Sequence, residues 1–341
     1  MIATSRHLAL CIVLLLASIL PAMPAGLAER MVWPPAPDRP RIEFVRSFTS
    51  PADLGIEKGL FARFKEFLFG AADERLVRPM AVVARAGIIH VADPGVRGVH
   101  RFDLARGEYA LIRAADDLPL PSPVGLALGP DGTVYATDSV LGKVFVIRPE
   151  SGQAVPLVLS APLRQPTGIA YDAGHGRLIV TDTAAHQIVL LSRDGREIRR
   201  VGRRGNGNGE FNYPTHLWLD GQGRLLVTDS LNFRIQTFDA DGGFTGMFGR
   251  QGDGTGDTSR AKGVATDRYG HIYVTDALFH AVQIFDGAGR LLLPIGGQGH
   301  DYGEFWLPAG LFVDTADGDT IYVADSHNRR IQVMRYVGGA T

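Results

Sequence analysis

The stretch YPTHLWLDGQGRLLVTDSLNFRIQTFDADGGFTGMFG, from Tyr213 to Gly249, decides the fold. It contains an inner strand, a Gly turn, a second strand, an Asp turn, a third strand, an Asp-Gly turn and an outer strand, in that order. No segment within it has helical periodicity. A unit of four short strands has the size of one blade of a β-propeller.

The same unit recurs along the chain, marked by the pattern apolar, apolar, Ala or Thr, Asp. The marker aspartates are separated by 45, 44, 47, 47 and 49 residues. A period in the forties with strand-like alternation predicts an all-β, six-bladed β-propeller of four-stranded blades. The markers are IHVAD, VYATD, LIVTD, LLVTD, IYVTD and IYVAD, which end at Asp93, Asp138, Asp182, Asp229, Asp276 and Asp325.

Two repeats carry a more specific signal. The segments DSLNFRIQTF from Asp229 and DSHNRRIQVM from Asp325, with the connectors GRRGNGNGEFNYP and GGQGHDYGEFWLP, resemble the NHL repeat. The resemblance covers residues 76–337 and implies a closed six-bladed propeller of the NHL-repeat family. That family includes ligand-binding, protein-binding and a few lyase members, so the fold by itself names no function.

The last repeat lacks an outer strand, because the chain reaches Tyr336 and Val337 on its third strand. We expect residues 41–50, which contain RIEFVRSF, to supply the missing strand and so to cover an exposed sheet edge. The preceding residues 29–40 form a stiff, Pro-rich lead-in. A Trp-Pro-rich opening followed by such a strand resembles exported bacterial NHL proteins.

An insertion, residues 51–75, separates this closure strand from the first blade. It contains GLFARFKEFLFGA, in which Leu60, Phe64, Phe67 and Leu68 recur at helical spacing. The spacing predicts an amphipathic helix. Two interpretations stay open: the helix packs on the propeller, or it docks on a partner or a membrane surface.

The first 28 residues are typical of a signal peptide. Arg6 and His7 precede an apolar run, Leu8 to Leu20, that is too short to span a bilayer, and small residues follow it. We therefore expect an exported protein, periplasmic or extracellular. The single cysteine, Cys11, lies in this segment, which leaves a mature chain with no disulfide, thiolate metal site or haem attachment.

The charge balance argues against nucleic acid as a partner. Removal of the segment with Arg6 leaves 34 basic residues, one fewer than the 35 of the whole chain, against 36 acidic ones, a net charge of −2. A nucleic-acid binder needs an excess of basic charge.

The six marker aspartates could be mistaken for a ring of metal ligands. Each follows a strand and begins a turn, where an Asp side chain accepts hydrogen bonds from backbone N–H groups. A structural role is the better interpretation, and functional residues are to be sought where one blade departs from the repeat.

Such a departure occurs on the inner strands, which line the axial tunnel of a propeller. At one aligned position the fourth repeat has His216 where the others have Ala81, Gly125, Gly168, Gly263 and Gly310. The preceding position holds Lys262 in the fifth repeat, beside Thr167 and Thr215 in the third and fourth. We predict a ligand-binding tunnel mouth around these four residues. The alternative is that His216 is a hydrogen-bonded plug of the tunnel and that Lys262 reaches solvent.

Four residues after the marker aspartates, His186, His280, Arg97 and Arg329 should lie on loops at the tunnel mouth. They could bind an anionic group, or contribute with His216 to a metal site. The simpler alternative is that they are ordinary surface loop residues.

The connectors GNGNG (205–209) and GDGTGD (252–257) superficially resemble phosphate or calcium loops. They lead into strands rather than helices, and the second lacks the spaced acidic ligands of a calcium loop. We expect their glycines to supply positive φ angles in the turns between blades.

Basic residues crowd the outer strand and connector of the third repeat. Arg199, Arg200, Arg203 and Arg204 form either a solvated face or a docking surface for an acidic protein or polysaccharide.

Two functions from different classes remain. The favoured one is a non-catalytic, monomeric binding or scaffold protein of the cell envelope, without a cofactor, that uses its loop face to recognise a protein or polysaccharide partner. The resemblance to exported bacterial NHL proteins implies partners such as multihaem cytochromes or surface polysaccharides. The alternative is a zinc-dependent lyase or calcium-dependent lactonase, as in other propellers, with His216, His186 or His280 as ligands.

Overall fold

The structure, a computed structural model, describes residues 31–57, 74–114, 119–149 and 152–338. The predicted signal peptide and the segment 58–73, on which the predicted amphipathic helix falls, lie outside these residues. Within the described ranges, no helix is long and apolar enough to cross a membrane. The described helices are short 3-10 turns: η1 (Pro51–Leu54), η3 (Pro130–Gly132), η4 (Thr183–Ala185) and η5 (Ser230–Asn232).

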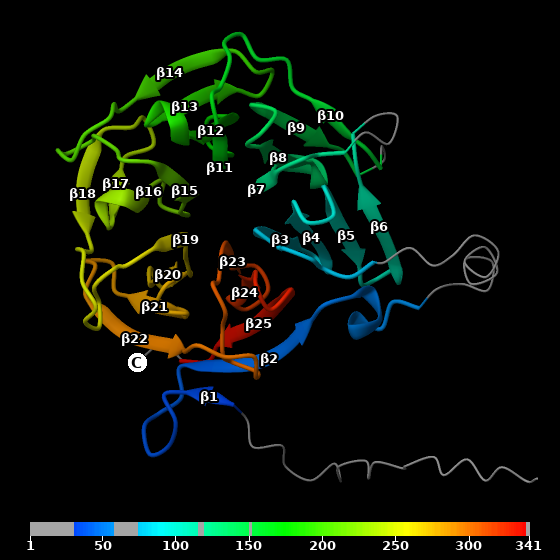
Figure 1. Cartoon of the computed structure of the whole chain (residues 1–341), viewed down its shortest axis with the longest axis vertical. Coiled ribbons are helices and arrows are strands. Elements are labelled where there is room, and N and C mark those ends of the chain that lie inside the picture. Colours follow the sequence, from blue (N-terminus) through cyan, green and yellow to red (C-terminus); the bar gives the residue numbers. More distant parts are fainter. Residues whose placement is uncertain (1–30, 58–73, 115–118, 150–151, 339–341) are drawn as a thin grey trace, which may run out of the picture. The chain divides into compact units, whose positions relative to one another are not determined.

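The strands form six antiparallel sheets around a central axis (Figure 1). Blades 1 to 3 are β3 (Ala81–Arg85), β4 (Ile88–Asp93), β5 (Gly98–Asp103) and β6 (Glu108–Ile112); β7 (Pro123–Leu128), β8 (Val134–Asp138), β9 (Lys143–Ile147) and β10 (Ala154–Pro156); and β11 (Pro166–Asp172), β12 (Arg177–Asp182), β13 (Gln187–Ser192) and β14 (Glu197–Val201). Blades 4 and 5 are β15 (Pro214–Leu219), β16 (Leu225–Asp229), β17 (Arg234–Phe238) and β18 (Phe244–Phe248); and β19 (Ala261–Thr266), β20 (Ile272–Asp276), β21 (Ala281–Phe285) and β22 (Leu291–Gly296). Blade 6 comprises β23 (Leu311–Asp314), β24 (Thr320–Asp325), β25 (Arg330–Tyr336), β2 (Ile42–Phe48) and β1 (Val32–Trp33). The prediction of a six-bladed propeller is confirmed.

The hydrophobic core lies between neighbouring blades rather than at one centre. Successive side chains of a strand point to opposite faces, so each sheet contributes apolar residues to the blade before it and the blade after it. The cluster between blades 3 and 4, for example, joins Ile179 and Leu190 to Phe211 and Leu217. Each blade is therefore stabilised by its two neighbours.

The N-terminal strand closes the ring, as predicted from residues 41–50. β2 pairs antiparallel with β25, with Ile42 opposite Tyr336 and Phe48 opposite Ile331. Ile42 and Phe48 are buried. Beyond it, β1 adds a two-residue fifth strand that the Pro-rich lead-in did not suggest, because two residues are too few to show a period.

The marker aspartates hold each turn to the loop that enters the same blade. Asp138 accepts hydrogen bonds from the backbone N–H groups of Ser122 at 2.9 Å, Val140 at 3.0 Å and Leu141 at 2.9 Å. All six marker carboxylates are buried: Asp93, Asp138, Asp182, Asp229, Asp276 and Asp325. The predicted structural role is confirmed.

The threonine before four of these aspartates joins adjacent blades. Thr228 donates from Oγ1 to the carbonyl oxygen of Lys262 at 2.8 Å, and Thr181 donates to that of Thr215 at 3.2 Å. Thr137 and Thr275 make the same bond to Thr167 and Ala309. These bonds hold the beginnings of the inner strands, and the residues there, in register around the axis.

Candidate binding site along the central axis

The inner strands of neighbouring blades lie close together at the aligned position that holds His216. A Cβ on Gly168 would lie 2.8 Å from the Cα of His216, and one on Gly310 would lie 2.6 Å from the carbonyl oxygen of Met80. Glycine is required in these two blades because neighbouring backbones leave no room for a side chain. His216 is the one large side chain among the six aligned residues, all of which the structure describes.

The imidazole of His216 has no hydrogen-bond partner among the residues that the structure describes. Both ring nitrogens are buried, and neither has a partner in the described part of the chain. Burial, with a smaller contribution from the positive charge of Lys262, lowers the pKa of His216 from 6.5 to about 3. The ring is therefore neutral at ordinary pH and has one donor and one acceptor without a partner in the described residues.

Lys262 lies on β19 of the adjacent blade, one residue before Gly263, which is aligned with His216. Its side chain is half-buried, and burial, followed by the charge of Arg260, lowers its pKa. No hydrogen bond or ion pair of its ammonium group occurs among the described residues. The predicted pair of outliers is thus brought together. The alternative of a hydrogen-bonded plug is wrong, because neither nitrogen of His216 has a partner among the described residues; ligand binding stays a prediction.

The two threonines predicted beside them already have partners. The hydroxyl of Thr167 shares hydrogen bonds with Thr181 at 2.9 Å and Thr183 at 2.7 Å, and that of Thr215 with Ser230 at 2.6 Å. They support the inner strands, and their participation in binding stays a prediction.

His186 and His280 occupy turns with left-handed backbone, at φ 56° and 53°. Nδ1 of His186 accepts the backbone N–H of Tyr213, and Nδ1 of His280 accepts that of Leu307, both at 3.1 Å. Each histidine thereby holds the connector that enters the next blade. One nitrogen of each ring is occupied, and no group of three His, Cys, Asp or Glu residues able to hold a metal ion occurs in the described ranges.

Arg97 and Arg329 share this left-handed turn position, at φ 56° and 54°, and both side chains are exposed. Three further exposed arginines precede inner strands on the same side of the ring. None of the five side chains has an ion pair or hydrogen bond in the described structure. We call these residues the arginine ring: Arg78, Arg97, Arg164, Arg260 and Arg329.

The basic residues predicted as a docking surface on blade 3 are mostly paired. Arg200 contacts Glu197 at 2.9 Å, Arg203 contacts Glu210 at 2.7 Å, and Arg199 donates to the carbonyl oxygen of Asp241 at 3.0 Å. Arg204 is exposed and has no such partner among the described residues. Their role in partner docking stays a prediction, with Arg204 the least constrained of the four.

The glycine connectors are built around a carboxylate. A Cβ on Gly205 would lie 2.1 Å from Oε2 of Glu210, and one on Gly252 would lie 2.1 Å from Oδ2 of Asp257. Only Gly209 and Gly256 of these loops have the expected positive φ, at 73° and 89°. The glycines at 205, 207, 252 and 254 lack a side chain where the carboxylate of Glu210 or Asp257 lies against the loop. The sequence prediction missed this role.

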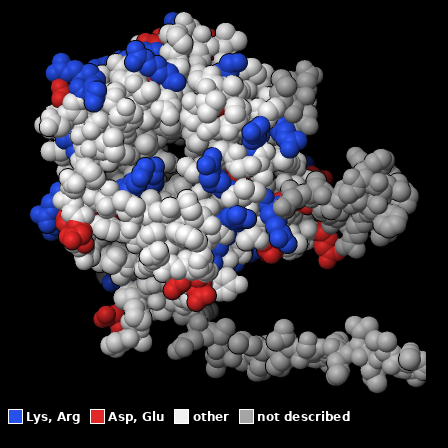
Figure 2. Space-filling view, in the orientation of Figure 1, with Lys and Arg blue, Asp and Glu red and all other residues white. Residues whose placement is uncertain are grey.

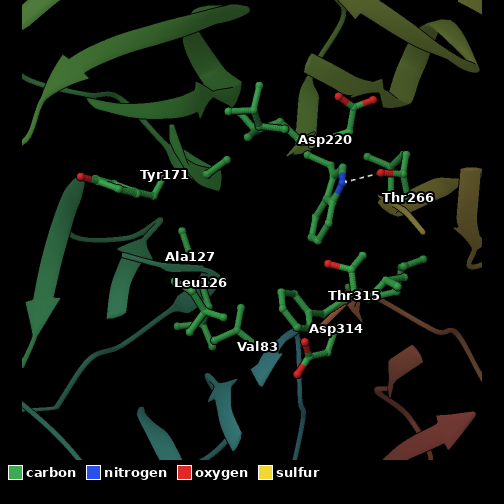
Figure 3. A pocket seen from close by; sticks show the side chains of 18 of the residues that line it. Val83, Leu126, Ala127, Tyr171, Asp220, Thr266, Asp314 and Thr315 are labelled. Atoms are coloured by element: carbon green, nitrogen blue, oxygen red, sulfur yellow. Dashed lines mark hydrogen bonds between the residues drawn. The ribbon is translucent and has the colours of Figure 1, made fainter. Parts of the chain in front are cut away.

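A cavity of about 600 Å³ extends from the level of His216 to the turns after the inner strands. Figure 3 shows part of its lining. Trp218 and Phe312 are its largest apolar side chains, and both were missed in the sequence. The repeats differ at the position two residues after His216, where two are aromatic and four are small, and this difference could have identified them. The aligned residues are Val83, Ala127, Ala170, Trp218, Ala265 and Phe312. We call this space the central funnel.

Known proteins share this architecture. Residues 162–246 match a family model described as a 6-bladed beta-propeller. The chain is a six-bladed β-propeller. The propeller superposes on virginiamycin B lyase from Staphylococcus aureus with a TM-score of 0.55 and 17% identity, over 76% of this chain and 96% of that one. An auxiliary nutrient binding protein from Bacteroides thetaiotaomicron gives a TM-score of 0.61 and 13% identity, over 78% and 71%.

Curated proteins match part of the chain in sequence. The peptidyl-glycine alpha-amidating monooxygenase of Mus musculus is 32% identical over 111 residues, which are 28% of the propeller chain. The match spans 11% of the length of the mouse protein. The two solved structures named above are a lyase and a binding protein. The fold is therefore shared by enzymes and by non-catalytic binding proteins.

Proposed function

We propose that the propeller is an exported binding or scaffold protein of the cell envelope, which recognises an acidic partner through the loop face where its inner strands begin. The observation that carries this proposal is the arginine ring. Figure 2 shows Lys and Arg side chains around the central opening of the ring, while most of the acidic side chains visible there lie toward its outer edge.

The marker aspartates form no ion pair with the arginine ring among the described residues. Their carboxylates are buried and accept hydrogen bonds from turn residues, as Asp276 does from the backbone N–H groups of Ser259 at 2.7 Å and Arg260 at 3.0 Å. Exposed guanidinium groups without neighbouring carboxylates attract an acidic surface and bind carboxylate or sulfate groups in pairs of hydrogen bonds. The resemblance to exported NHL proteins adds an envelope protein, such as a multihaem cytochrome, or a polysaccharide as the partner.

Charge reversal on the two faces tests this function. The variant Arg78→Glu/Arg260→Glu/Arg329→Glu changes the arginine ring, and Arg106→Glu/Arg196→Glu/Arg290→Glu makes the same change in the turns between third and outer strands on the opposite face. We expect wild type and control to be retained on immobilised polygalacturonate, or to capture an acidic envelope protein, with release by salt. The ring variant should lose this binding. Equal retention of both variants would refute the proposal.

A metal-dependent lyase or lactonase is the alternative, and the free nitrogens of His216 are the observation in its favour. Elemental analysis of the purified propeller separates the two functions. Stoichiometric zinc or calcium that is lost in His216→Ala would support the enzyme and count against the scaffold.

A further inference from the structure

The central funnel lies at the other end of the axis from the arginine ring. Its lining includes the turns after the inner strands, through Gly221, Arg268 and Thr315, so it opens on the face opposite the marker aspartates. Small-molecule sites enclose about 300–1,000 Å³, and the funnel volume of about 600 Å³ falls within this range.

Two aromatic rings make one wall of the funnel. The centroids of Trp218 and Phe312 lie 5.6 Å apart with an interplanar angle of 69°, although the residues belong to different blades. The indole Nε1 donates to Oγ1 of Thr266 at 3.0 Å, which holds the ring plane in place (Figure 3, dashed line). Across the funnel lie the smaller side chains of Leu126 and Ala127 (Figure 3). The wall thus offers a fixed aromatic surface opposite open space.

The charged groups at the funnel rim are neutralised in pairs. Asp220 contacts Arg224 at 3.0 Å, and in Figure 3 its carboxylate points away from the cavity. Asp267 contacts His271 at 2.7 Å. The same holds for Arg268, which contacts Asp319 at 2.6 Å. A ligand would meet no unpaired formal charge among these groups, and burial of a charged ligand without a partner is costly.

Asp314, the remaining acidic group of the lining, is also constrained. It accepts the backbone N–H groups of Ala316 at 3.0 Å and Asp317 at 3.3 Å, and burial raises its pKa. Arg85 lies within electrostatic reach of it. The inner end of the funnel holds the neutral imidazole of His216, with both nitrogens buried and unpartnered. Buried polar atoms without partners are rare in native proteins.

From this arrangement we propose that the central funnel binds an uncharged small molecule with a planar aromatic ring, which packs on Trp218 and Phe312 and hydrogen bonds to His216. The aromatic wall supplies most of the binding energy, and the imidazole supplies direction. This site is independent of the arginine ring, because it opens on the opposite face and takes a neutral ligand.

The probe for this site is N-phenyl-1-naphthylamine, a neutral aromatic amine whose single N–H can donate to His216 and whose fluorescence rises in apolar surroundings. Titration of the mature propeller should give a saturable increase. Trp218→Ala should weaken binding by about tenfold, because it removes the aromatic wall, and His216→Phe by about threefold to tenfold, because it removes one hydrogen bond. The matched control is Trp306→Ala, since Trp306 lies on a connector outside the funnel lining.

Two further arms keep the proposal falsifiable. Trp218→Phe retains an aromatic ring and should bind within about threefold of wild type, which separates loss of the wall from loss of the fold. The sulfonated analogue 8-anilino-1-naphthalenesulfonate should bind at least about tenfold more weakly, because Arg85, the lining cation without an ion pair among the described residues, already donates to the carbonyl oxygen of Gly129 at 3.0 Å and acts on Asp314. The arginine-ring variant should bind the neutral probe normally. No saturable signal, or an equal loss in Trp306→Ala, would overturn the proposal.

Discussion

Asp325 accepts a hydrogen bond from Nε of Arg330 at 2.8 Å, and both side chains are buried. Asn328 and Gln332 donate to the same carboxylate at 2.9 and 3.1 Å. Arg330 in turn donates to the carbonyl oxygen of Glu304 in the connector at 2.8 Å. The Asn-x-Arg-x-Gln pattern of blades 4 and 6 is therefore a buried network that joins a turn to its connector.

Removal of this carboxylate should cost more than removal of its counterpart in blade 2. Asp325→Ala leaves a buried guanidinium without its anion and should lower the free energy of unfolding by about 3–5 kcal/mol. Asp138→Ala leaves only backbone N–H groups unpaired and should cost about 1–3 kcal/mol. Urea denaturation of both variants measures the difference. Equal losses would show that Arg330 adds nothing to the turn.

The closure strand offers a matched pair of substitutions. Ile42 of β2 is fully buried in the hydrophobic core, whereas Val45 on the same strand is 36% exposed. Ile42→Ala should lower the free energy of unfolding by about 2–5 kcal/mol, and Val45→Ala by no more than about 0.5 kcal/mol. Thermal and urea denaturation both report this. If Ile42→Ala has no effect, β2 does not stabilise the closed ring.

Among the connector glycines without a positive φ, those that lie against a carboxylate should be intolerant of a methyl group. A Cβ on Gly299 would lie 1.8 Å from Oε2 of Glu304, while one on Gly297 would meet nothing within 4 Å. Gly299→Ala should therefore cost about 1–3 kcal/mol and Gly297→Ala much less. In a Glu304→Ala background the penalty of Gly299→Ala should shrink, which a double-mutant cycle measures. An unchanged penalty would assign the cost to the backbone.

The His271–Asp267 pair predicts a pH-dependent stability. The hydrogen bond to Asp267 is the main cause that raises the pKa of His271 above its ordinary value of 6.5, against an opposing effect of burial. A raised folded-state pKa means that the contribution is complete below pH 6.5 and is lost as the pH rises through the folded-state value. His271→Gln should therefore reduce stability more at pH 5.5 than at pH 8.5. In an Asp267→Asn background this pH dependence should disappear.

The architecture could be predicted from the sequence because local patterns that repeat along the chain determine it. The number of marker aspartates predicts the number of blades, and their period, with the alternation within each unit, predicts four strands per blade. The missing outer strand of the last repeat even indicates that residues 41–50 must return to it. Each inference depends on residues that are close in the chain or equivalent between repeats, which is the information a single sequence holds.

The comparison of repeats also identified His216 and Lys262, since a departure from the pattern is visible without a structure. Only the tertiary structure decided what surrounds them. It places Nδ1 of His186 on the backbone of Tyr213, and it packs Trp218 against Phe312 from a different blade. It also shows that the arginine ring is unpaired in the described residues, while Arg203 pairs with Glu210. Such contacts join segments far apart in the chain, so they depend on closure of the ring and not on any local pattern.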